Sequence, residues 1–362
     1  MSKILLVGAE PDKMPRLKLV YKSLKTLGHD VKVFAPFQRK GNSIIRYLAN
    51  MAKLMFERAE IYHLFNIPDV IGIPLLFKRG RLVYDIRSPW REIVLDSTGN
   101  RILAKIAEVI ERVFCLKADS VISANPLLGK RAKMYGAKDF VNVPNFPYEK
   151  MKTDGWDGIA ETLRGLGEKQ DGVVMFFGKI SIPEGSNVLA DVIIETLKID
   201  YDLFGVRFVI AGDGPELENL KEKIRKAGMM DRVHFLGWVP HEKIGMWIKA
   251  ADLCIMPREE GGTTKWMHPD CIWKVNEAVS IGTPVLATEY GGFKLENMFL
   301  PLFIVENEHY STVIIQMLEV ALRWGSPDLK LHLKEKRDWT ISRDRLKEVY
   351  GVGLDNGKKD TL

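Results

Sequence analysis

The sequence predicts an α/β fold made of two domains, each built around a parallel β-sheet. Short apolar stretches that end in glycine alternate with amphipathic helical stretches, beginning with the β-strand at 3–7, the helix after it and the β-strand at 31–34. The same alternation starts afresh at 173–177, after an irregular stretch at 146–171 that we interpret as a linker. A chain of 362 residues is long enough for two hydrophobic cores.

The composition is typical of a soluble globular protein, with 46% hydrophobic and 28% charged residues. The three cysteines are widely scattered, so we expect reduced thiols in a cytoplasmic protein: Cys115, Cys254 and Cys271. The N-terminal apolar run is too short for a signal peptide, and no apolar segment approaches the ~20 residues that cross a bilayer. No spacing of cysteine and histidine suggests a metal site.

Charge is distributed unevenly along the chain. Residues 1–150 hold 26 of the 53 basic and 14 of the 47 acidic residues, whereas the remainder holds 27 basic and 33 acidic residues. The first part is therefore basic and the second acidic, within a net charge of +6. This asymmetry predicts that the first part meets an anionic partner, for which we expect a membrane surface or an anionic acceptor and no nucleic acid.

The stretch 43–58 predicts a helix with apolar residues on one side and basic residues around them. One interpretation is a helix packed on the core with a solvated basic face. The other is an interfacial helix that lies on anionic lipid. The segment 74–81 repeats the apolar and basic pattern, so peripheral membrane association and simple core packing both stay open.

Two further strands extend the first sheet, and the second of them leads directly into a polar stretch at 85–92. Polar residues at the carboxyl end of a parallel strand commonly border a ligand site, which makes Arg87 a candidate. The alternative is a capped turn in which Asp85 and Ser88 bond to nearby amides. His63, in the strand before, is a lone histidine, a pattern that more often indicates a structural role than a catalytic one.

The stretch around which the chain is organised is a helix that begins near 272, a tight turn at Gly282 and a buried strand at 285–287. Lys274 and Glu277 lie on the polar face of this helix. The ordinary interpretation of such a face is a ladder of i,i+4 ion pairs. Because a buried strand follows at once, the helix belongs inside an α/β domain, and Glu277 is the first candidate for a ligand contact.

A loop rich in glycine and threonine precedes that helix and predicts a phosphate-binding loop, with an ordinary surface loop as the alternative. The candidate residues are Gly261, Gly262, Thr263 and Thr264. One Asp-x-Asp motif, at 200–202, falls between a helix and a strand. We interpret it as a turn and therefore expect no catalytic metal.

The phrase Glu-Ala-Val-Ser-Ile-Gly-Thr-Pro-Val-Leu-Ala-Thr at 277–288, followed by a glycine pair, resembles the signature of the retaining family 4 of GT-B glycosyltransferases, or glycosyl transferases group 1. The resemblance extends in order along nearly the whole chain. It implies two Rossmann-like domains that face each other across a cleft, and a C-terminal helix that crosses back to the first domain. The implied boundaries are 1–150 for an acceptor-side domain, 151–171 for the linker, 172–328 for a nucleotide-sugar-binding domain and 329–354 for the returning helix.

On the donor side the resemblance implies roles for individual residues. Glu277 matches the glutamate that binds the nucleotide ribose, and Lys274 matches a lysine that some members carry three residues before it. Lys179 stands where the family has an arginine that clamps the donor diphosphate. The loop at Trp238 and Val239 matches the place where the family seats the nucleotide base.

Three residues of the first domain match positions that the family uses on the acceptor side: His63, Arg87 and Arg16. Two residues depart from the family pattern on the donor side. Glu184 stands where a second clamping cation is expected, and Pro269 stands where many members have a second glutamate. Lys265 is a hypothetical replacement for the missing cation.

The implied function is transfer of a hexose from a UDP- or GDP-linked sugar to a saccharide or lipid-linked acceptor near a membrane surface, with retention and without a further cofactor. In that family the leaving phosphate is thought to deprotonate the incoming hydroxyl, so the protein supplies position and charge. The competing class is a non-catalytic GT-B protein that binds or regulates a partner, which Glu184 and Pro269 motivate. A GT-B epimerase is a third option.

Overall fold

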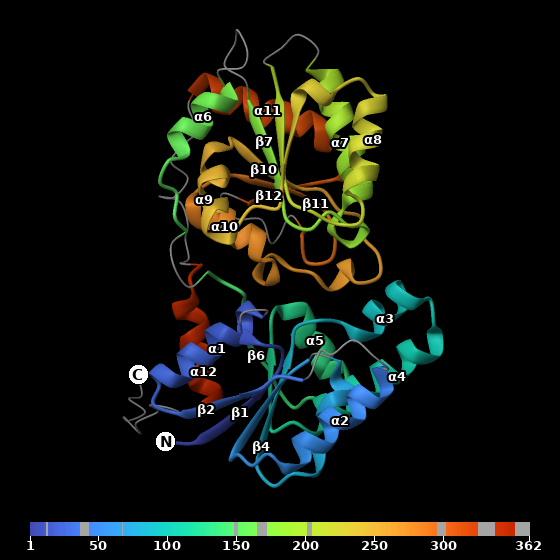
Figure 1. Ribbon diagram of the computed structural model, residues 1–362, viewed down its shortest axis with the longest axis vertical. Coiled ribbons are helices and arrows are strands. Elements are labelled where there is room, and N and C mark those ends of the chain that lie inside the picture. Colours follow the sequence, from blue (N-terminus) through green and yellow to red (C-terminus); the bar gives the residue numbers. More distant parts are fainter. Residues whose placement is uncertain are drawn as a thin grey trace, which may run out of the picture. The chain divides into compact units, whose positions relative to one another are not determined.

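The computed structural model forms two compact units (Figure 1). The first contains Met1–Tyr148 and Trp339–Leu362, and the second contains Glu149–Asp338. The structure describes residues 1–11, 14–36, 43–66, 68–147, 151–164, 172–200, 205–294, 302–324 and 337–351. The predicted fold class is confirmed, because each unit is an α/β layer structure around a six-stranded sheet whose strands are all parallel.

The sheet of the first unit has the strand order β2-β1-β3-β4-β5-β6. Its strands are β1 (Lys3–Val7), β2 (Asp30–Phe34), β3 (Ile61–Phe65), β4 (Arg81–Ile86), β5 (Ser120–Ser123) and β6 (Val141–Asn142). The central strands are buried along nearly their whole length, as expected for a parallel sheet with both faces covered.

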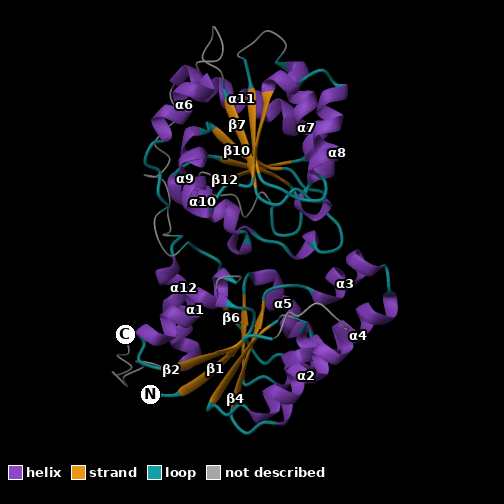
Figure 2. Cartoon of the chain, viewed as in Figure 1, coloured by secondary structure: helices purple, strands orange, loops and turns teal. Residues whose placement is uncertain are grey.

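Helical segments connect these strands and cover the sheet (Figure 2). They are α1 (Pro15–Thr26), α2 (Ser43–Phe56), the 3₁₀ segment η2 (Asp69–Phe77), α3 (Trp90–Thr98), α4 (Arg101–Lys117) and α5 (Pro126–Met134). Local sequence explains where several of them begin. The side chains of Asn100 and Asn125 accept backbone N–H groups at the start of α4 and α5, and proline occupies the first position of α1 and α5.

The last described helix, α12 (Trp339–Tyr350), is part of the first unit. The indole Nε1 of Trp339 donates to Ser23 Oγ at 2.8 Å, and the hydroxyl of Ser342 donates to the carbonyl of Pro144 at 2.7 Å. Leu346 and Val349 are buried beneath the helix. Of the range expected for the returning helix, residues 329–336 and 352–354 lie outside the described residues, as does the tail at 355–362.

The sheet of the second unit has the strand order β12-β11-β10-β7-β8-β9. Its strands are β7 (Val173–Phe177), β8 (Arg207–Ala211), β9 (Val233–Gly237), β10 (Leu253–Met256), β11 (Val285–Thr288) and β12 (Leu302–Val305). The helices are α6 (Trp156–Arg164), α7 (Ser186–Ile199), α8 (Leu217–Lys226), α9 (His241–Ala250), α10 (Trp273–Ile281) and α11 (Tyr310–Trp324). The sheet separates two apolar cores, one beneath α6, α9 and α10 and the other beneath α7, α8 and α11.

The prediction of an irregular linker at 146–171 is wrong for its middle part, which forms α6 and packs on α9. Ile159 and Leu163 contribute to the core, and with Trp156 they recur at the i, i+3, i+7 spacing of a buried stripe. The glycines on either side hid this short pattern. The predicted turn at 200–202 is described only at Asp200, whose buried carboxylate accepts the backbone N–H of Val206 at 2.7 Å.

Candidate functional site

The carboxyl ends of β7, β8 and β9 meet α10 around a cavity of about 440 Å³ in the second unit. Parallel sheets commonly bind ligands at this edge, where the strands end and the connecting loops begin. Five residues selected from the sequence line this cavity: Lys179, Trp238, Val239, Lys274 and Glu277. Asp213 and His241, which the sequence analysis did not select, line it too.

Glycines allow the turns after β7 and β8 to touch backbone to backbone. A Cβ atom added at Gly212 would overlap the carbonyl oxygen of Gly178, and one added at Gly214 would overlap that of Ile180. The backbone N–H of Gly178 donates to the carbonyl of Ala211 at 2.9 Å. Only glycine fits this close approach, so the two turns form a fixed floor for the cavity.

Lys274 reaches the cavity from α10 by passing directly over Gly178, where an added Cβ atom would lie 2.8 Å from the lysine Cδ. Gly178 has a φ of 122°, which other residues rarely adopt. The Nζ atom of Lys274 lies 2.6 Å from Glu184 Oε2 and 5.0 Å from the ring centre of Phe176. Burial lowers the pKa of Lys274, and the neighbouring carboxylate of Glu184 opposes this effect.

Glu184 is held between two cations. Its carboxylate pairs with Lys274 and also with the guanidinium of Arg258, which is buried just after β10. Burial alone would raise the pKa of Glu184, but Lys274 and Arg258 outweigh it and hold that pKa below its usual value. The exposed Lys179 acts in the same direction. We call Glu184, Lys274 and Arg258 the charge triad.

Glu184 stands where the resemblance implies a second clamping cation, and the structure pairs its carboxylate with Lys274 and Arg258. Of these cations only Lys274 lines the cavity, and with Lys179 it supplies positive charge there. Lys265 does not supply this charge, since it is not among the residues that line the cavity and its Nζ lies 5.7 Å from the ring centre of Trp266. Arg258 could not be selected from the sequence, because its partner Glu184 is distant in the chain.

Glu277 and His241 form a second pair of side chains that line the cavity. Glu277 Oε1 lies 2.8 Å from His241 Nε2, and this hydrogen bond raises the pKa of the imidazole. Trp238 follows the left-handed Gly237 at the end of β9 and leaves 74% of its surface exposed. An aromatic face, a carboxylate and a cluster of cations therefore border one cavity.

The predicted phosphate loop is not among the residues that line this cavity. The hydroxyl of Thr264 accepts the backbone N–H of Gly261 at 2.9 Å and lies 2.8 Å from the carbonyl oxygens of Glu259 and Gly261. The loop is thus closed on itself by its own hydroxyl group. Gly262 adopts a left-handed φ of 40°, consistent with a tight surface turn.

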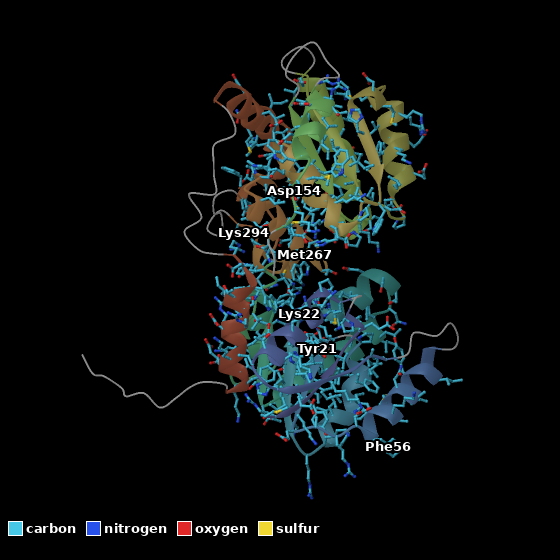
Figure 3. All side chains as sticks on the ribbon, turned by 60° about the vertical axis from the view of Figure 1, so that its left-hand side comes forward. Tyr21, Lys22, Phe56, Asp154, Met267 and Lys294 are labelled. Atoms are coloured by element: carbon cyan, nitrogen blue, oxygen red, sulfur yellow. The ribbon has the colours of Figure 1, made fainter. Side chains whose placement is uncertain are left out.

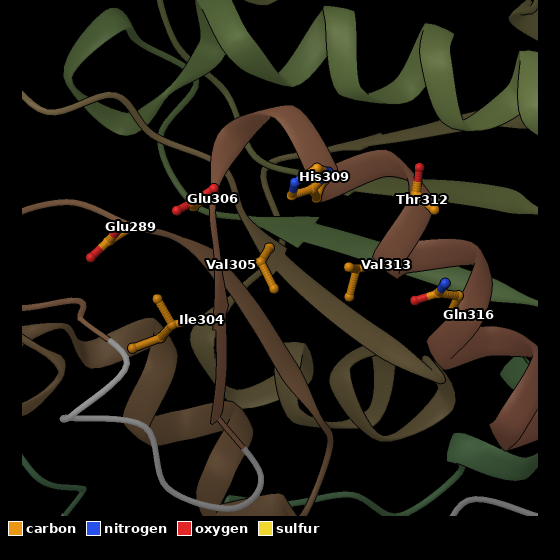
Figure 4. Close-up of a pocket in the computed structure, with 8 residues that line it drawn as sticks. All are labelled: Glu289, Ile304, Val305, Glu306, His309, Thr312, Val313 and Gln316. Carbon is orange, nitrogen blue, oxygen red and sulfur yellow. The ribbon is translucent and has the colours of Figure 1, made fainter.

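A second cavity, of about 380 Å³, lies between β12 and the start of α11. Figure 4 shows the carboxylates of Glu289 and Glu306 on one side of it and the polar ends of Thr312 and Gln316 on the other. None of the residues selected from the sequence is among those that line it.

In the first unit, Arg16 and His63 are parts of a buried network rather than of an open site. The guanidinium of Arg16 donates to both carboxylate oxygens of Asp85, at 2.8 and 3.0 Å, and to the carbonyl of Val143 at 2.6 Å. His63 Nε2 lies 3.5 Å from Asp85 Oδ2, and His63 Nδ1 bonds to the hydroxyl of Tyr350. Burial lowers the pKa of His63, which favours the neutral imidazole.

The expected acceptor contacts of Arg16 and His63 are therefore corrected, because both side chains are buried and their polar groups are used inside the unit. The sequence could not supply their shared partner, Asp85, because it lies on a different element, β4. Arg87 differs. It is half-buried at the carboxyl end of β4, and among the described residues its Nε atom has no hydrogen-bond partner.

Residues 171–319 match the family described as "Glycosyl transferases group 1". Within this segment, which is less than half of the chain, the sequence is similar to that family. One relative is the 2-deoxystreptamine glucosyltransferase of Streptomyces kanamyceticus, 28% identical over 54% of this chain and 49% of its own length. Another is the alpha-monoglucosyldiacylglycerol synthase of Streptococcus pneumoniae, 25% identical over 71% of this chain and 56% of its own length. The chain spans about half or less of the first curated relatives that it matches.

Solved structures share the fold. Sucrose-phosphate synthase of Thermosynechococcus elongatus superimposes with a TM-score of 0.69 at 13% identity, over 97% of this chain and 98% of that one. Anabaena HepE, solved in complex with UDP-glucose, superimposes with a TM-score of 0.67 at 17% identity, over 97% of this chain and all of that one. These likenesses identify the GT-B fold of the two units.

Proposed function

We propose that this protein is a retaining glycosyltransferase that moves a hexose from a UDP- or GDP-linked sugar to a saccharide or lipid-linked acceptor near a membrane surface. The observation that carries the proposal is the charge triad beside Lys179. It holds Lys274 beside Lys179 at a fixed glycine floor, and two lysines in this position suit the diphosphate of a nucleotide. HepE was solved with UDP-glucose, and the named relatives transfer sugars to aminocyclitol or lipid acceptors.

Each wall of the cavity fits one part of a nucleotide sugar. The exposed face of Trp238 offers a stacking surface for the base. The carboxylate of Glu277 can accept hydrogen bonds from two ribose hydroxyls once His241 releases it. Lys179 and Lys274 approach the place of the phosphates, where they would stabilise the negative charge that develops on the leaving diphosphate.

On this proposal the protein acts by position and charge. The leaving phosphate takes the proton of the incoming hydroxyl on the same face of the sugar, so the new bond keeps the anomeric configuration. Arg87, half-buried at the carboxyl edge of the first sheet, is our candidate for binding an anionic group of the acceptor. No additional cofactor or metal takes part in this scheme.

Two residues motivate the alternative of a non-catalytic GT-B protein. Pro269 still stands where many members have a glutamate, and it begins a short 3₁₀ segment in front of α10. Glu184 still stands where a second clamping cation is expected, although its carboxylate is paired with Lys274 and Arg258.

The test is calorimetric binding of UDP, GDP, ADP and their common sugar conjugates. We expect one nucleotide to bind the wild type, and Glu277→Ala and Lys274→Met each to weaken it about tenfold or more, as expected for a lost hydrogen bond to a charged group. The matched control is Glu242→Ala, an exposed carboxylate on α9 that does not line the cavity. Absence of binding across the panel would favour the regulatory alternative. Retention is tested separately, by the anomeric configuration of the product in NMR spectra.

A further inference from the structure

Three neighbouring elements of the first unit form one continuous surface. The segments α2, η2 and α4 carry the chain from β2 to β3, from β3 to β4 and from β4 to β5, always in the same direction across the sheet. Right-handed crossovers that run in one direction lie on one face of a parallel sheet. Because η2 contacts both α2 and α4, the three elements are adjacent on that face (Figure 1).

The helix α4 exposes an apolar stripe along its whole length. Its members are Ile102, Ile106, Val109, Val113 and Leu116, all of them exposed. They are separated alternately by four and three residues, a spacing that places them in one line on a helix. A solvated surface helix normally has polar residues in such a line, so the stripe requires an explanation.

The neighbouring elements extend the apolar surface. On α2, Ile45, Leu48, Met55 and Phe56 are exposed, and Phe56 keeps 85% of its surface accessible at the end of the helix (Figure 3). On η2, Phe77 is 80% exposed. Large aromatic side chains are rarely left in water to this extent, which makes the surface a candidate for burial against another phase or molecule.

Cations lie along both edges of the stripe, and the one carboxylate beside it, Glu108, is only partly exposed. Lys105 and Arg112 are exposed along one edge of α4, and Lys117 is exposed on the other edge. The acidic groups of these elements are all engaged: Asp69 accepts from Tyr84, Glu108 pairs with Lys105, and Glu111 pairs with Arg131. No carboxylate on the described residues of α2, η2 and α4 is classed as exposed.

We propose that the α2–η2–α4 surface docks on a membrane leaflet that contains anionic lipids, with its apolar side chains among the acyl chains and its cations at the headgroups. Apolar burial and attraction to anionic lipid act together in this type of contact. A second copy of the chain is a poorer fit, because pairing the surface with itself would bring two basic borders together. This inference rests on the proposed membrane-proximal acceptor, for which it names the surface that faces the lipid.

The experiment is flotation of the full chain with vesicles of phosphatidylcholine alone or with about one third phosphatidylglycerol. We expect the wild type to bind the anionic vesicles, and this binding to weaken as salt is added. Ile106→Glu should reduce the affinity for these vesicles about tenfold or more. Ile199→Glu is the matched control, since Ile199 is an exposed isoleucine in a helix of the second unit, 43% exposed against 49% for Ile106. The double variant Lys105→Gln and Arg112→Gln should bind anionic vesicles about fivefold more weakly for each cation removed. Its binding to vesicles of phosphatidylcholine alone should not change.

Nucleotide binding, measured on the same preparations, separates this inference from the proposed function. If the wild type bound nucleotide but neither kind of vesicle, the proposed membrane-docking surface would be overturned and the transferase proposal would stay intact. Sedimentation of the lipid-free protein provides a second test. A wild-type dimer that Ile106→Glu converts to monomers, without vesicle binding, would overturn the lipid assignment in favour of self-association. Equal loss of vesicle binding in Ile106→Glu and Ile199→Glu would also overturn it.

Discussion

His241 Nε2 lies 2.8 Å from Glu277 Oε1, and both side chains line the cavity at the end of the second sheet. The carboxylate that we assign to the ribose is therefore already bonded to a titratable group. A ligand that uses Glu277 must compete with the imidazole, and the strength of that competition depends on whether His241 carries a proton.

The first prediction is that nucleotide affinity rises with pH. Glu277 raises the pKa of His241 above its ordinary 6.5, so the protonated, charge-assisted pair persists somewhat above that pH. As the pH rises through the raised pKa of His241, the imidazole becomes neutral and its hydrogen bond to the Glu277 carboxylate weakens. Calorimetry between about pH 6 and about pH 8.5 should show tighter binding at the upper end.

The matched variant for this prediction is His241→Gln, which keeps a hydrogen-bond donor but does not titrate. Its affinity should change little over the same range. If the variant showed the same pH dependence as the wild type, another group would be responsible and the competition between His241 and the ribose would be rejected.

The second prediction concerns Glu184. Glu184→Gln leaves two buried cations without their counter-charge, so the free energy of unfolding should fall by about 2 kcal/mol. The same change makes the cavity more positive, and the diphosphate of a bound nucleotide can take the place of the carboxylate. We therefore expect nucleotide binding to tighten about fivefold while stability falls.

Urea unfolding and calorimetry on one preparation measure both quantities. Glu259→Gln, on the exposed loop after β10, is the control carboxylate. Weaker nucleotide binding by Glu184→Gln would mean that Glu184 mainly orients Lys274, and it would contradict the charge argument.

The sequence predicted the two sheets and the donor side of the site because both depend on local patterns. The family resemblance implied donor-side roles for Lys179, Trp238 and Glu277, and these three residues line one cavity. The prediction required no knowledge of which side chains pair.

Pairing between distant residues is what the sequence could not supply. Glu184 appeared as an unmatched carboxylate because Arg258 is 74 residues away and reaches it only through the parallel order of β7 and β10. Arg16, on α1, and His63, on β3, appeared as free functional groups because Asp85, their shared partner, lies on β4. Charge compensation of this kind depends on tertiary contacts between distant residues. Residue type and spacing describe only the local sequence and therefore do not reveal it.

The third prediction uses that buried network. Burial opposes ionisation of Asp85, but Arg16 and His63 bring its pKa down to about 2 from an ordinary 3.8. A depressed pKa stabilises the fold above the ordinary value, and this contribution is lost as the pH falls through about 2. Asp85→Asn should therefore cost about 3 kcal/mol at neutral pH, because it leaves Arg16 buried without a counter-charge.

Urea unfolding of wild type and Asp85→Asn, from neutral pH down to about pH 2, checks the sign as well as the size. The difference between the two proteins should narrow toward acid, where the wild-type carboxylate takes up a proton. The network would be less important than we infer if Asp85→Asn were as stable as wild type at neutral pH. If the stability difference between wild type and Asp85→Asn grew in acid, the depressed pKa of Asp85 would be wrongly assigned.

The fourth prediction tests the glycine floor of the cavity. A Cβ atom at Gly212 would overlap the carbonyl of Gly178, so Gly212→Ala must push the turns after β7 and β8 apart. We expect the free energy of unfolding to fall by about 1–3 kcal/mol and nucleotide affinity to fall about tenfold or more. Gly158→Ala is the control, since nothing lies within 4 Å of its added Cβ and alanine suits its helix α6. The control should be as stable as wild type or slightly more stable. Wild-type affinity in Gly212→Ala would show that the close approach of the two turns does not shape the site.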